Sequence, residues 1–192
     1  MNLLTDSLPT KILIKNKVFH INYDYRTVIK IILAFEDEEL TPNEKSYIML
    51  KLLYKEDIPD DYLEEAIKKA IKFIDLGQEI KETEPAQRVF SYKKDGNYIF
   101  SGINQTHHID LESMPNLHWW KFMALFMDMG TECTFNELIY YRKRKIEGKL
   151  TKEEKKKYRE IKDLVSLEET KKINTAKQKF LDELRGGDNG QL

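Results

Sequence analysis

The feature that most restricts the fold of this chain is a repeated signal for the start of a helix. Thr41-Pro42-Asn43-Glu44 combines a capping box with proline at the first helical position. Thr134 to Glu137 and Thr151 to Glu154 repeat the threonine–glutamate spacing. We therefore expect helices over about residues 42–54, 135–147 and 152–165. The first of these is apolar nearly all round, which predicts that it is buried on every side.

Apolar residues at helical spacing predict three further helices. The first starts after a capping aspartate, Asp24, and the second lies between Pro59 and Gly77. The third covers residues 116–129, begins after Pro115 and ends at Gly130. It is the most apolar segment of the chain, but its 13 residues from 117 to 129 are too few to span a bilayer.

Two segments carry strand signals. Residues 11–14 and 18–21 are rich in branched side chains and are separated by Lys15-Asn16-Lys17, which predicts an N-terminal hairpin. Residues 89–103 allow two interpretations, a strand that ends in an Asp95-Gly96 turn or a short helix capped by Asp95. The predicted fold is mostly α (α+β), with a small N-terminal β-hairpin followed by a bundle-like domain of about seven helices.

The domain organisation follows from these elements. Residues 1–165 are expected to form a globular helical domain with the hairpin at its start. Residues 166–192 are expected to form a C-terminal amphipathic helix, at about residues 168–184, and a glycine-rich flexible tail. The single cysteine, Cys133, excludes an internal disulfide and indicates a reducing compartment.

Charge is distributed unevenly along the chain. The net charge is −1, but residues 1–141 hold 16 basic and 23 acidic residues, whereas residues 142–185 hold 16 basic and 9 acidic residues. This asymmetry suggests that the C-terminal segment meets something acidic. The alternative is a solvated helix surface, because acidic residues stay interleaved with the basic ones. Binding to a membrane or to nucleic acid is not favoured by the overall balance.

The residue types needed for common catalytic sites are missing. No glycine-rich phosphate-binding loop and no nucleophilic serine elbow occurs in the sequence. His107, His108 and His118 with Cys133 match no familiar zinc spacing. Paired acids lie at predicted helix ends, where carboxylates favour the helix dipole. We therefore expect a protein that binds other proteins, without catalytic residues and without a cofactor.

Two positions stand out on predicted apolar faces. Arg142 lies within the apolar stripe of its helix, so it either pairs with a carboxylate, such as Asp110 or Asp128, or is presented to a partner. Trp119 and Trp120 are adjacent and point about 100° apart on a helix. Either both are buried in a central helix, or one indole anchors a partner protein.

These residues also carry a family resemblance. The run Ile109-Asp110-Leu111, then His118-Trp119-Trp120-Lys121-Phe122, then Arg142 about twenty residues on, resembles the phage gene-product-fifteen family over about residues 8–165. The Asp24-Tyr25-Arg26 helix start is also similar. The motif positions in this chain are His118, Trp119, Trp120, Phe122 and Arg142. His107-His108 stands where the family leads us to expect Tyr-Gly, so the local turn is expected to differ.

The resemblance implies a protein of tailed phages and prophages of Gram-positive bacteria, acting in the cytoplasm of the infected or lysogenic bacterial host. It implies a tail assembly chaperone that keeps the tape measure protein soluble and helps to recruit tail-tube subunits. The family assigns no catalytic role to the motif. The alternative is a structural component of the tail or of the head–tail junction. Neither the resemblance nor the residues define the oligomeric state.

Overall fold

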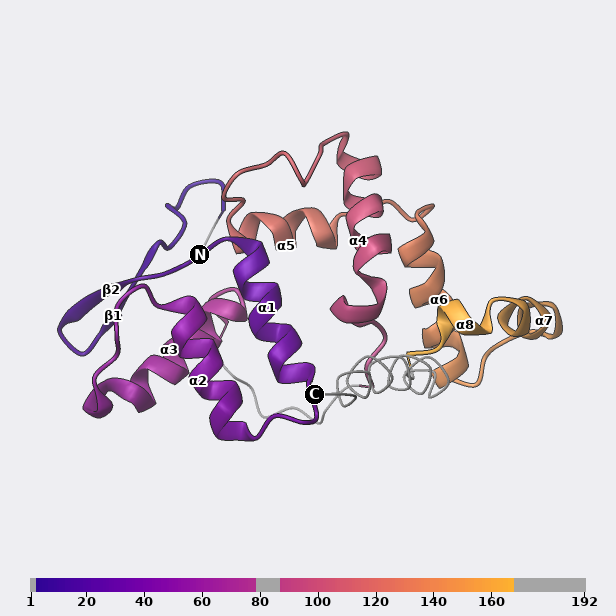
Figure 1. Cartoon of the computed structure of the whole chain (residues 1–192). Coiled ribbons are helices and arrows are strands. Elements are labelled where there is room, and N and C mark those ends of the chain that lie inside the picture. Colours follow the sequence, from indigo (N-terminus) through magenta and orange to yellow (C-terminus); the bar gives the residue numbers. More distant parts are fainter. Residues whose placement is uncertain (1–2, 79–86, 168–192) are drawn as a thin grey trace, which may run out of the picture. The chain divides into compact units, whose positions relative to one another are not determined.

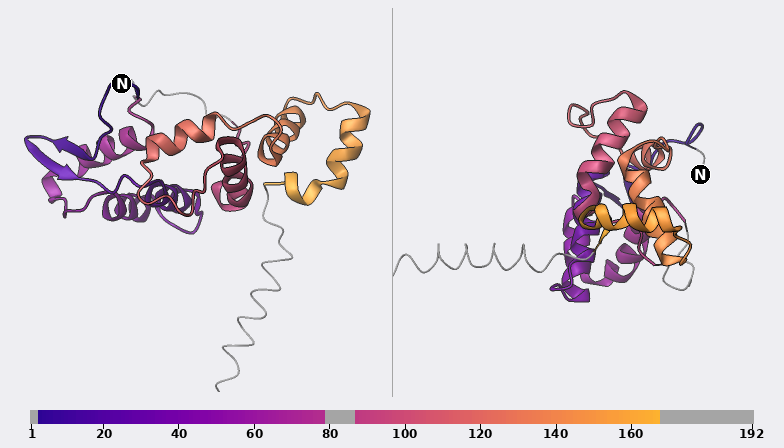
Figure 2. Two further views of the ribbon diagram at one scale, coloured as in Figure 1. Left: turned by 90° about the horizontal axis from the view of Figure 1, so that it is seen from above. Right: turned by 90° about the vertical axis from the view of Figure 1, so that its right-hand side faces the viewer.

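The structure is a computed structural model that describes residues 3–78 and 87–167 (Figures 1 and 2). This part of the chain contains a two-stranded hairpin, eight α-helices and a short 3-10 helix, which confirms the predicted mostly helical fold with a small hairpin. The chain divides into two compact units, Met1–Glu137 and Leu138–Leu192. The expected division after residue 165 and the expected helix at 168–184 stay predictions, because residues from 168 onward lie outside the described part.

The hairpin is formed by β1 (Lys11–Ile14) and β2 (Lys17–His20), which pair antiparallel with Ile12 opposite Phe19. Its second strand begins one residue earlier than expected. Figures 1 and 2 show the hairpin beside α3. Ile14 and Phe19 are fully buried, and the Phe19 ring lies edge-on to the rings of Tyr54 and Tyr62. Aromatic contacts of this kind join the hairpin to the helices of the N-terminal unit.

The first three helices follow their sequence signals closely. They are α1 (Tyr25–Glu36), α2 (Pro42–Leu53) and, after the 3-10 turn Asp60–Tyr62, α3 (Leu63–Ile74). Asp24 caps α1 and Thr41 forms the expected capping box of α2. The expectation that α2 is buried all round is wrong, since Tyr47 is 62% exposed. Only the face of α2 that meets α1 and α3 is covered.

Helix α4 (Tyr92–His107) decides between the two interpretations of residues 89–103, because the segment is helical and not a strand. Its cap differs from expectation. The side chain of Ser91 accepts a hydrogen bond from the Lys94 N–H, and the fully buried carboxylate of Asp95 accepts one from the Ser91 N–H at 3.0 Å. Asp95 therefore lies in the first turn and supports the cap from inside the helix.

Helix α5 (Trp119–Met127) starts three residues later than expected. The reason is the backbone of Asn116, whose φ of 52° is left-handed and incompatible with a helix at that point. The helical segments that follow are α6 (Thr134–Ile146), α7 (Lys152–Glu160) and α8 (Lys162–Val165). The single helix expected over 152–165 is thus two helices, because the chain leaves the helical region at Ile161.

Candidate protein-binding site

His118 caps helix α5 with its side chain. Its Nδ1 accepts a hydrogen bond from the Trp120 N–H at 3.0 Å, and its Nε2 lies 3.0 Å from the carbonyl oxygen of Pro9. The two contacts together require a neutral imidazole with the proton on Nε2, which donates to Pro9. Burial lowers the pKa of His118, and nearby Lys121 lowers this pKa further, whereas the bond to Pro9 raises it. The sequence did not predict this cap, because the helix was expected to begin at residue 116, before His118.

The two tryptophans of the motif close the end of α3. The indole of Trp119 donates to the carbonyl of Ile74, and the indole of Trp120 donates to the carbonyl of Phe73, each at 2.8 Å. The last carbonyls of a helix have no partner within the helix, so the Trp119 bond supplies one for Ile74. The Trp120 bond adds to the one that the Phe73 carbonyl accepts from the Leu76 N–H. Both indoles are buried. Of the two interpretations given for them, burial in the core is the one that the structure confirms.

Gly77 makes room for this arrangement. Its φ is 80°, and a Cβ atom there would lie 3.1 Å from Cη2 of Trp120. A side chain at this position would therefore meet both backbone strain and a close contact. Glycine at residue 77 therefore favours the close fit between the end of α3 and the start of α5.

Phe122 connects the motif to helix α1. Its ring stacks on the ring of Tyr25, with centroids 4.5 Å apart and planes 5° apart. The backbone strengthens the same junction, because Trp119 N–H donates to the carbonyl of Tyr23 and Tyr25 N–H donates to the carbonyl of Leu117. The motif helix and the start of α1 are thus joined by both stacking and hydrogen bonds.

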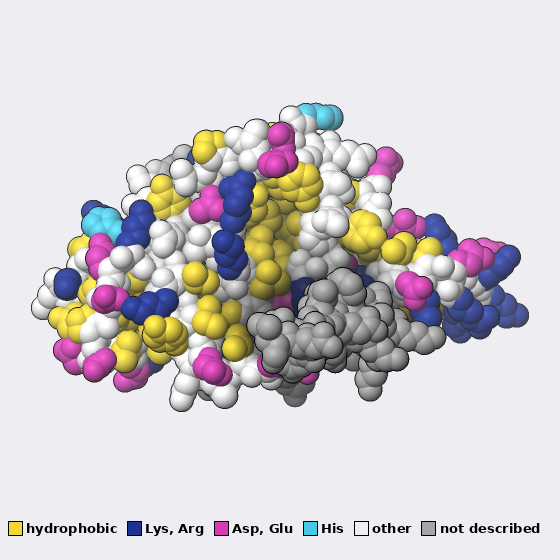
Figure 3. All heavy atoms as spheres, in the orientation of Figure 1, with side chains coloured by type: hydrophobic (Ala, Val, Ile, Leu, Met, Phe, Trp, Pro, Cys, Tyr) yellow, Lys and Arg dark blue, Asp and Glu magenta, His cyan; other side chains and the backbone are white. Residues whose placement is uncertain are grey.

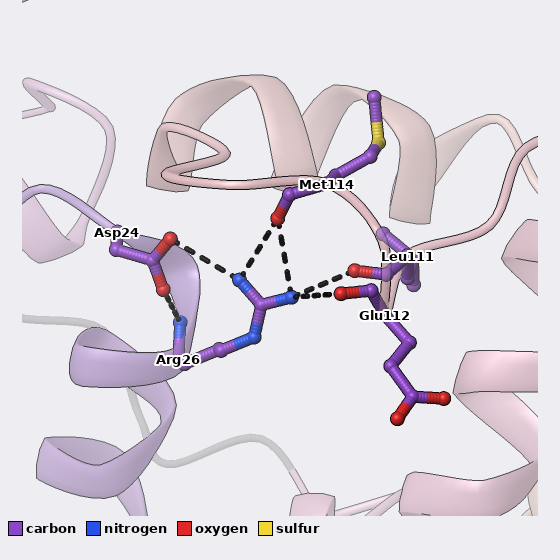
Figure 4. Close-up of polar contacts among 5 residues, drawn as sticks. All are labelled: Asp24, Arg26, Leu111, Glu112 and Met114. Carbon is purple, nitrogen blue, oxygen red and sulfur yellow. Dashed lines mark hydrogen bonds and ion pairs between the residues drawn. The ribbon is translucent and has the colours of Figure 1, made fainter.

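Arg26 holds the loop that leads to α5 (Figure 4). Its guanidinium donates to the carbonyls of Leu111 at 2.7 Å and of Met114 at 3.3 Å, and pairs with Asp24 at 3.3 Å. Hydrogen bonds from a charged donor are each worth about 1.5–3 kcal/mol. Asp24 also caps α1 by accepting from the Arg26 N–H. Asp24 and Arg26, at the helix start that resembles the family, thus form a clamp on residues 111–114.

The opposite end of α1 is fastened to the start of α4. Glu36, the last residue of α1, forms an ion pair with Arg88 and accepts a hydrogen bond from the Ser91 hydroxyl at 3.3 Å. Since Ser91 caps α4, this carboxylate ties the N-terminus of α4 to the C-terminus of α1. Glu36 thus joins the C-terminus of α1 directly to the N-terminus of α4. Arg26, at the N-terminus of α1, contacts the 111–114 loop that follows α4.

An apolar hollow opens between these two helices, and Figure 3 shows hydrophobic side chains gathered there between α1 and α4. Its volume is about 150 Å³. Burial raises the pKa of Tyr25 and of Tyr92, the two tyrosines that line the hollow. Phe100 is 40% exposed. At Gly96, no atom lies within 4 Å of the position that a Cβ would take. The hollow is lined by Tyr25, Ile29, Tyr92, Gly96, Ile99, Phe100, Leu111 and Phe122.

Arg142 has a different setting in the C-terminal unit. It is only 4% exposed, its Nε donates to the carbonyl of Val165 at 2.7 Å, and its Nη2 donates to the carbonyl of Leu164 at 3.1 Å. The sequence led us to expect a carboxylate as partner, whereas these acceptors are backbone carbonyls at the end of α8. Asp110 and Asp128 belong to the N-terminal unit, and their pairing with Arg142 stays a prediction.

The turn at His107-His108 keeps a backbone that suits glycine. His108 ends α4 with φ 51° and ψ 41°, a left-handed conformation that histidine adopts more readily than most residues. His107 is held at its Nε2, 2.9 Å from the carbonyl of Leu125. In the described part of the chain, no three His, Cys, Asp or Glu side chains are grouped as metal ligands would be.

A model of the bacteriophage Gp15 protein family matches residues 4–167. The chain belongs to this family. No curated protein and no solved structure gives a significant match. Among the described helices, none is long and apolar enough to cross a membrane.

Structure and sequence together sort the motif residues into two places. His118, Trp119, Trp120 and Phe122 lie together in the N-terminal unit, and Arg142 lies in the C-terminal unit. Each of these residues is buried. A direct protein-binding role for them stays a prediction. Sequence reasoning missed the hollow, whose accessible residues Ile29, Gly96 and Phe100 lie on two helices far apart in the chain.

Proposed function

We propose that this bacteriophage protein is a tail assembly chaperone in the cytoplasm of the host. It binds an amphipathic helix of the tape measure protein and helps to recruit tail-tube subunits. The observation that carries the proposal is the apolar hollow between α1 and α4 in a chain of the Gp15 family. Because the proposed action is binding, no residue is assigned a catalytic role and no cofactor is needed.

The size of the hollow favours a protein partner over a small molecule. Sites for drug-sized ligands usually measure about 300–1,000 Å³, whereas this hollow measures about 150 Å³. That space suits one or two apolar side chains projecting from a partner helix, as in helix-in-groove recognition. A tape measure protein, being long and helical, would offer such side chains repeatedly.

Rigid walls support the same use. A groove that is already formed loses little conformational entropy when it binds. Here Arg26 and Glu36 fix the two ends of α1, and the stacked rings of Tyr25 and Phe122 lie beneath the opening. In this proposal His118, Trp119 and Trp120 support the hollow from below without touching the partner, whereas Phe122 forms part of its lining.

Gly96 offers a direct test with a matched control at the same position. No atom lies within 4 Å of a Cβ built there, and Gly96 lines the hollow, so the Gly96→Leu side chain should extend into the hollow, whereas Gly96→Ala adds only a methyl group. Each variant is co-expressed with the tape measure protein of the same phage, and soluble complex is recovered by pull-down. We expect Gly96→Ala to retain the complex and Gly96→Leu to lose at least about 90% of it.

The outcomes separate the candidate functions. Equal recovery with Gly96→Leu and wild type, at matched melting temperatures, would exclude the hollow as the binding site. Purified phage particles provide the second measurement. A stoichiometric amount of the protein in particles would favour a structural component of the tail or head–tail junction over a chaperone, which should be found only in the lysate.

A further inference from the structure

Helix α7 carries a stripe of positive charge on its outer face. Lys152, Lys155, Lys156 and Arg159 are spaced i, i+3, i+4 and i+7, so they lie on one side of the helix. All four are exposed, and Figure 3 shows basic side chains gathered over α7. None of the four forms an ion pair with any residue that the structure describes. We name these four residues the α7 basic stripe.

The orientation of the stripe is fixed by the other side of the helix. There the Glu154 carboxylate accepts hydrogen bonds from the Tyr140 hydroxyl at 2.6 Å and from Arg144 Nε at 3.1 Å, and also closes the Thr151 capping box. Tyr158 lies under Lys145, whose Nζ is 4.9 Å from the ring centroid. These contacts hold α7 by its inner face, so the α7 basic stripe points away from the unit.

The stripe is unfavourable by itself. Like charges four residues apart on a helix destabilise it, and Lys152 with Lys156 and Lys155 with Arg159 form two such pairs. Glu153 and Glu160, three residues before and four residues after Lys156, offset part of this repulsion, but helix α7 has no buried residue that would offset the rest. Residues 138–167 as a whole hold 11 Lys and Arg against 5 Asp and Glu. A ligand that brings negative charge to the stripe would relieve the repulsion.

We infer that the α7 basic stripe is a docking face for an acidic helix of a partner protein. The partner would present carboxylates at the same i, i+3, i+4, i+7 spacing. Glu153 and Glu160, both exposed, lie about 80–100° round the helix from Lys152 and border one edge of the stripe. These acids would repel the continuous phosphate backbone of nucleic acid, but would pair with basic residues beside the acidic face of a protein helix.

The test uses the full chain and a labelled helical peptide of about 15 residues with four Glu at that spacing, followed by fluorescence anisotropy at low salt. The stripe variant changes Lys152, Lys155, Lys156 and Arg159 to Gln. The control variant changes four exposed lysines outside the stripe, Lys11, Lys30, Lys55 and Lys143, to Gln, so the net charge is the same. We expect the stripe variant to bind the peptide about ten-fold more weakly than wild type, which is the loss expected for four exposed ion pairs. The control variant should bind the peptide within about two-fold of wild type.

Two further probes decide between stripe recognition and general attraction. A peptide of the same composition in scrambled order should bind wild type more weakly than the ordered peptide. Equal binding of the two peptides, or an equal loss in both protein variants, would overturn the inference. Tighter, stripe-dependent binding of duplex DNA would also overturn it in favour of nucleic acid. Gly96→Leu should bind the peptide normally, so this surface is tested independently of the hollow.

Discussion

In the N-terminal unit the family motif lies among stacked rings, whereas in the C-terminal unit the motif residue is a buried guanidinium. His118, Trp119 and Phe122 contact aromatic neighbours and close the gap between α1, α3 and α5. Arg142 instead holds two carbonyls at the end of α8, and a Glu154-centred group of polar contacts holds α7. The motif residues of the N-terminal unit thus make mainly aromatic contacts, whereas Arg142, in the described part of the C-terminal unit, makes charged hydrogen bonds to carbonyls.

This difference has a functional meaning. An aromatic core fixes the walls of a hollow to within narrow limits, because close-packed interiors resist deformation. Charged hydrogen bonds near the surface can support a helix whose outer face is entirely polar, and α7 is such a helix. The N-terminal unit therefore suits recognition of apolar side chains, and the C-terminal unit suits recognition of charge. Substitutions in each unit and changes of pH can test this contrast.

The largest effect is expected for Trp120→Ala. The indole is buried, donates to the carbonyl of Phe73 and touches the position of Gly77. Its removal should lower the free energy of unfolding by about 3–5 kcal/mol, as for other buried aromatic residues. Urea denaturation followed by far-UV circular dichroism measures this. Trp120→Phe, which keeps a ring but loses the donor, should cost less. A loss below about 1 kcal/mol for Trp120→Ala would contradict an aromatic core.

The counterpart in the C-terminal unit is Arg142→Met. This change keeps much of the apolar stem but removes the donors to the carbonyls of Leu164 and Val165, so we expect a loss of about 2–3 kcal/mol. Hydrogen exchange should show reduced protection within residues 138–167 and normal protection in α1 and α3. Arg142→Lys should restore only part of the lost stability, because one ammonium group cannot reproduce the forked hydrogen bonding of the guanidinium. Uniform loss of protection across both units would show that they do not differ as described.

A pair of glycines, one in each unit, gives the next largest effect. Gly77 and Gly148 have φ of 80° and 68°, so alanine is strained at both, by about 1–2 kcal/mol. Only Gly77 faces a close neighbour, since a Cβ at Gly148 would meet no atom within 4 Å. Gly77→Ala should therefore be the more destabilising change in thermal unfolding. Equal losses would mean that the contact with Trp120 relaxes at no cost.

The smallest effects are expected from pH, and the two units should respond in different ranges. Burial lowers the pKa of His118 below its ordinary value of 6.5, so its contribution to stability is complete above pH 6.5 and is lost as the pH falls below that. Protonation of Nδ1 would remove the acceptor of the Trp120 N–H. Because both tryptophans lie in the N-terminal unit, their fluorescence should report this loss, and His118→Asn should abolish its pH dependence.

Glu154 should define the acid range of the C-terminal unit. The hydrogen bond from Tyr140, together with bonds from Thr151 and the charge of Arg144, lowers the pKa of Glu154 to about 2. Its contribution is therefore complete above pH 4.5 and is lost as the pH falls toward 2. Amide NMR signals of α7 should change in this range in wild type but not in Glu154→Gln. A transition of α7 near pH 6 would contradict the separation of the two ranges.

Local signals in the sequence predicted local structure well. The capping boxes at Thr41 and Thr151 and the cap at Asp24 are present, because each depends on residues within one helical turn. Features that depend on the rest of the fold were missed. The late start of α5 follows from the left-handed backbone at Asn116, and the exposure of Tyr47 follows from how few elements cover α2.

The candidate site was harder to predict for the same reason. Hydropathy indicated that Trp119 and Trp120 could be buried, but their acceptors, the carbonyls of Ile74 and Phe73, lie 45 and 47 residues away in sequence, respectively. Nothing in the composition of α1 or α4 alone marks a hollow, since its lining belongs to both. Arg142 was correctly singled out as a charge on an apolar face, yet the carbonyls that accept its hydrogen bonds have no side-chain signature.

The clamp at Arg26 has a consequence for how the chain reaches its native state during synthesis. Arg26 and the carbonyl of Met114 are 88 residues apart. The backbone hydrogen bonds between Tyr23 and Trp119 and between Tyr25 and Leu117 span a similar length of chain. Such contacts form late, because the loop must close before they contribute. While the ribosome is still translating the segment before Trp119, the start of α1 lacks these partners. The N-terminal unit can therefore be completed only after nearly all of it has emerged, and a nascent chain stalled before α5 should remain sensitive to protease.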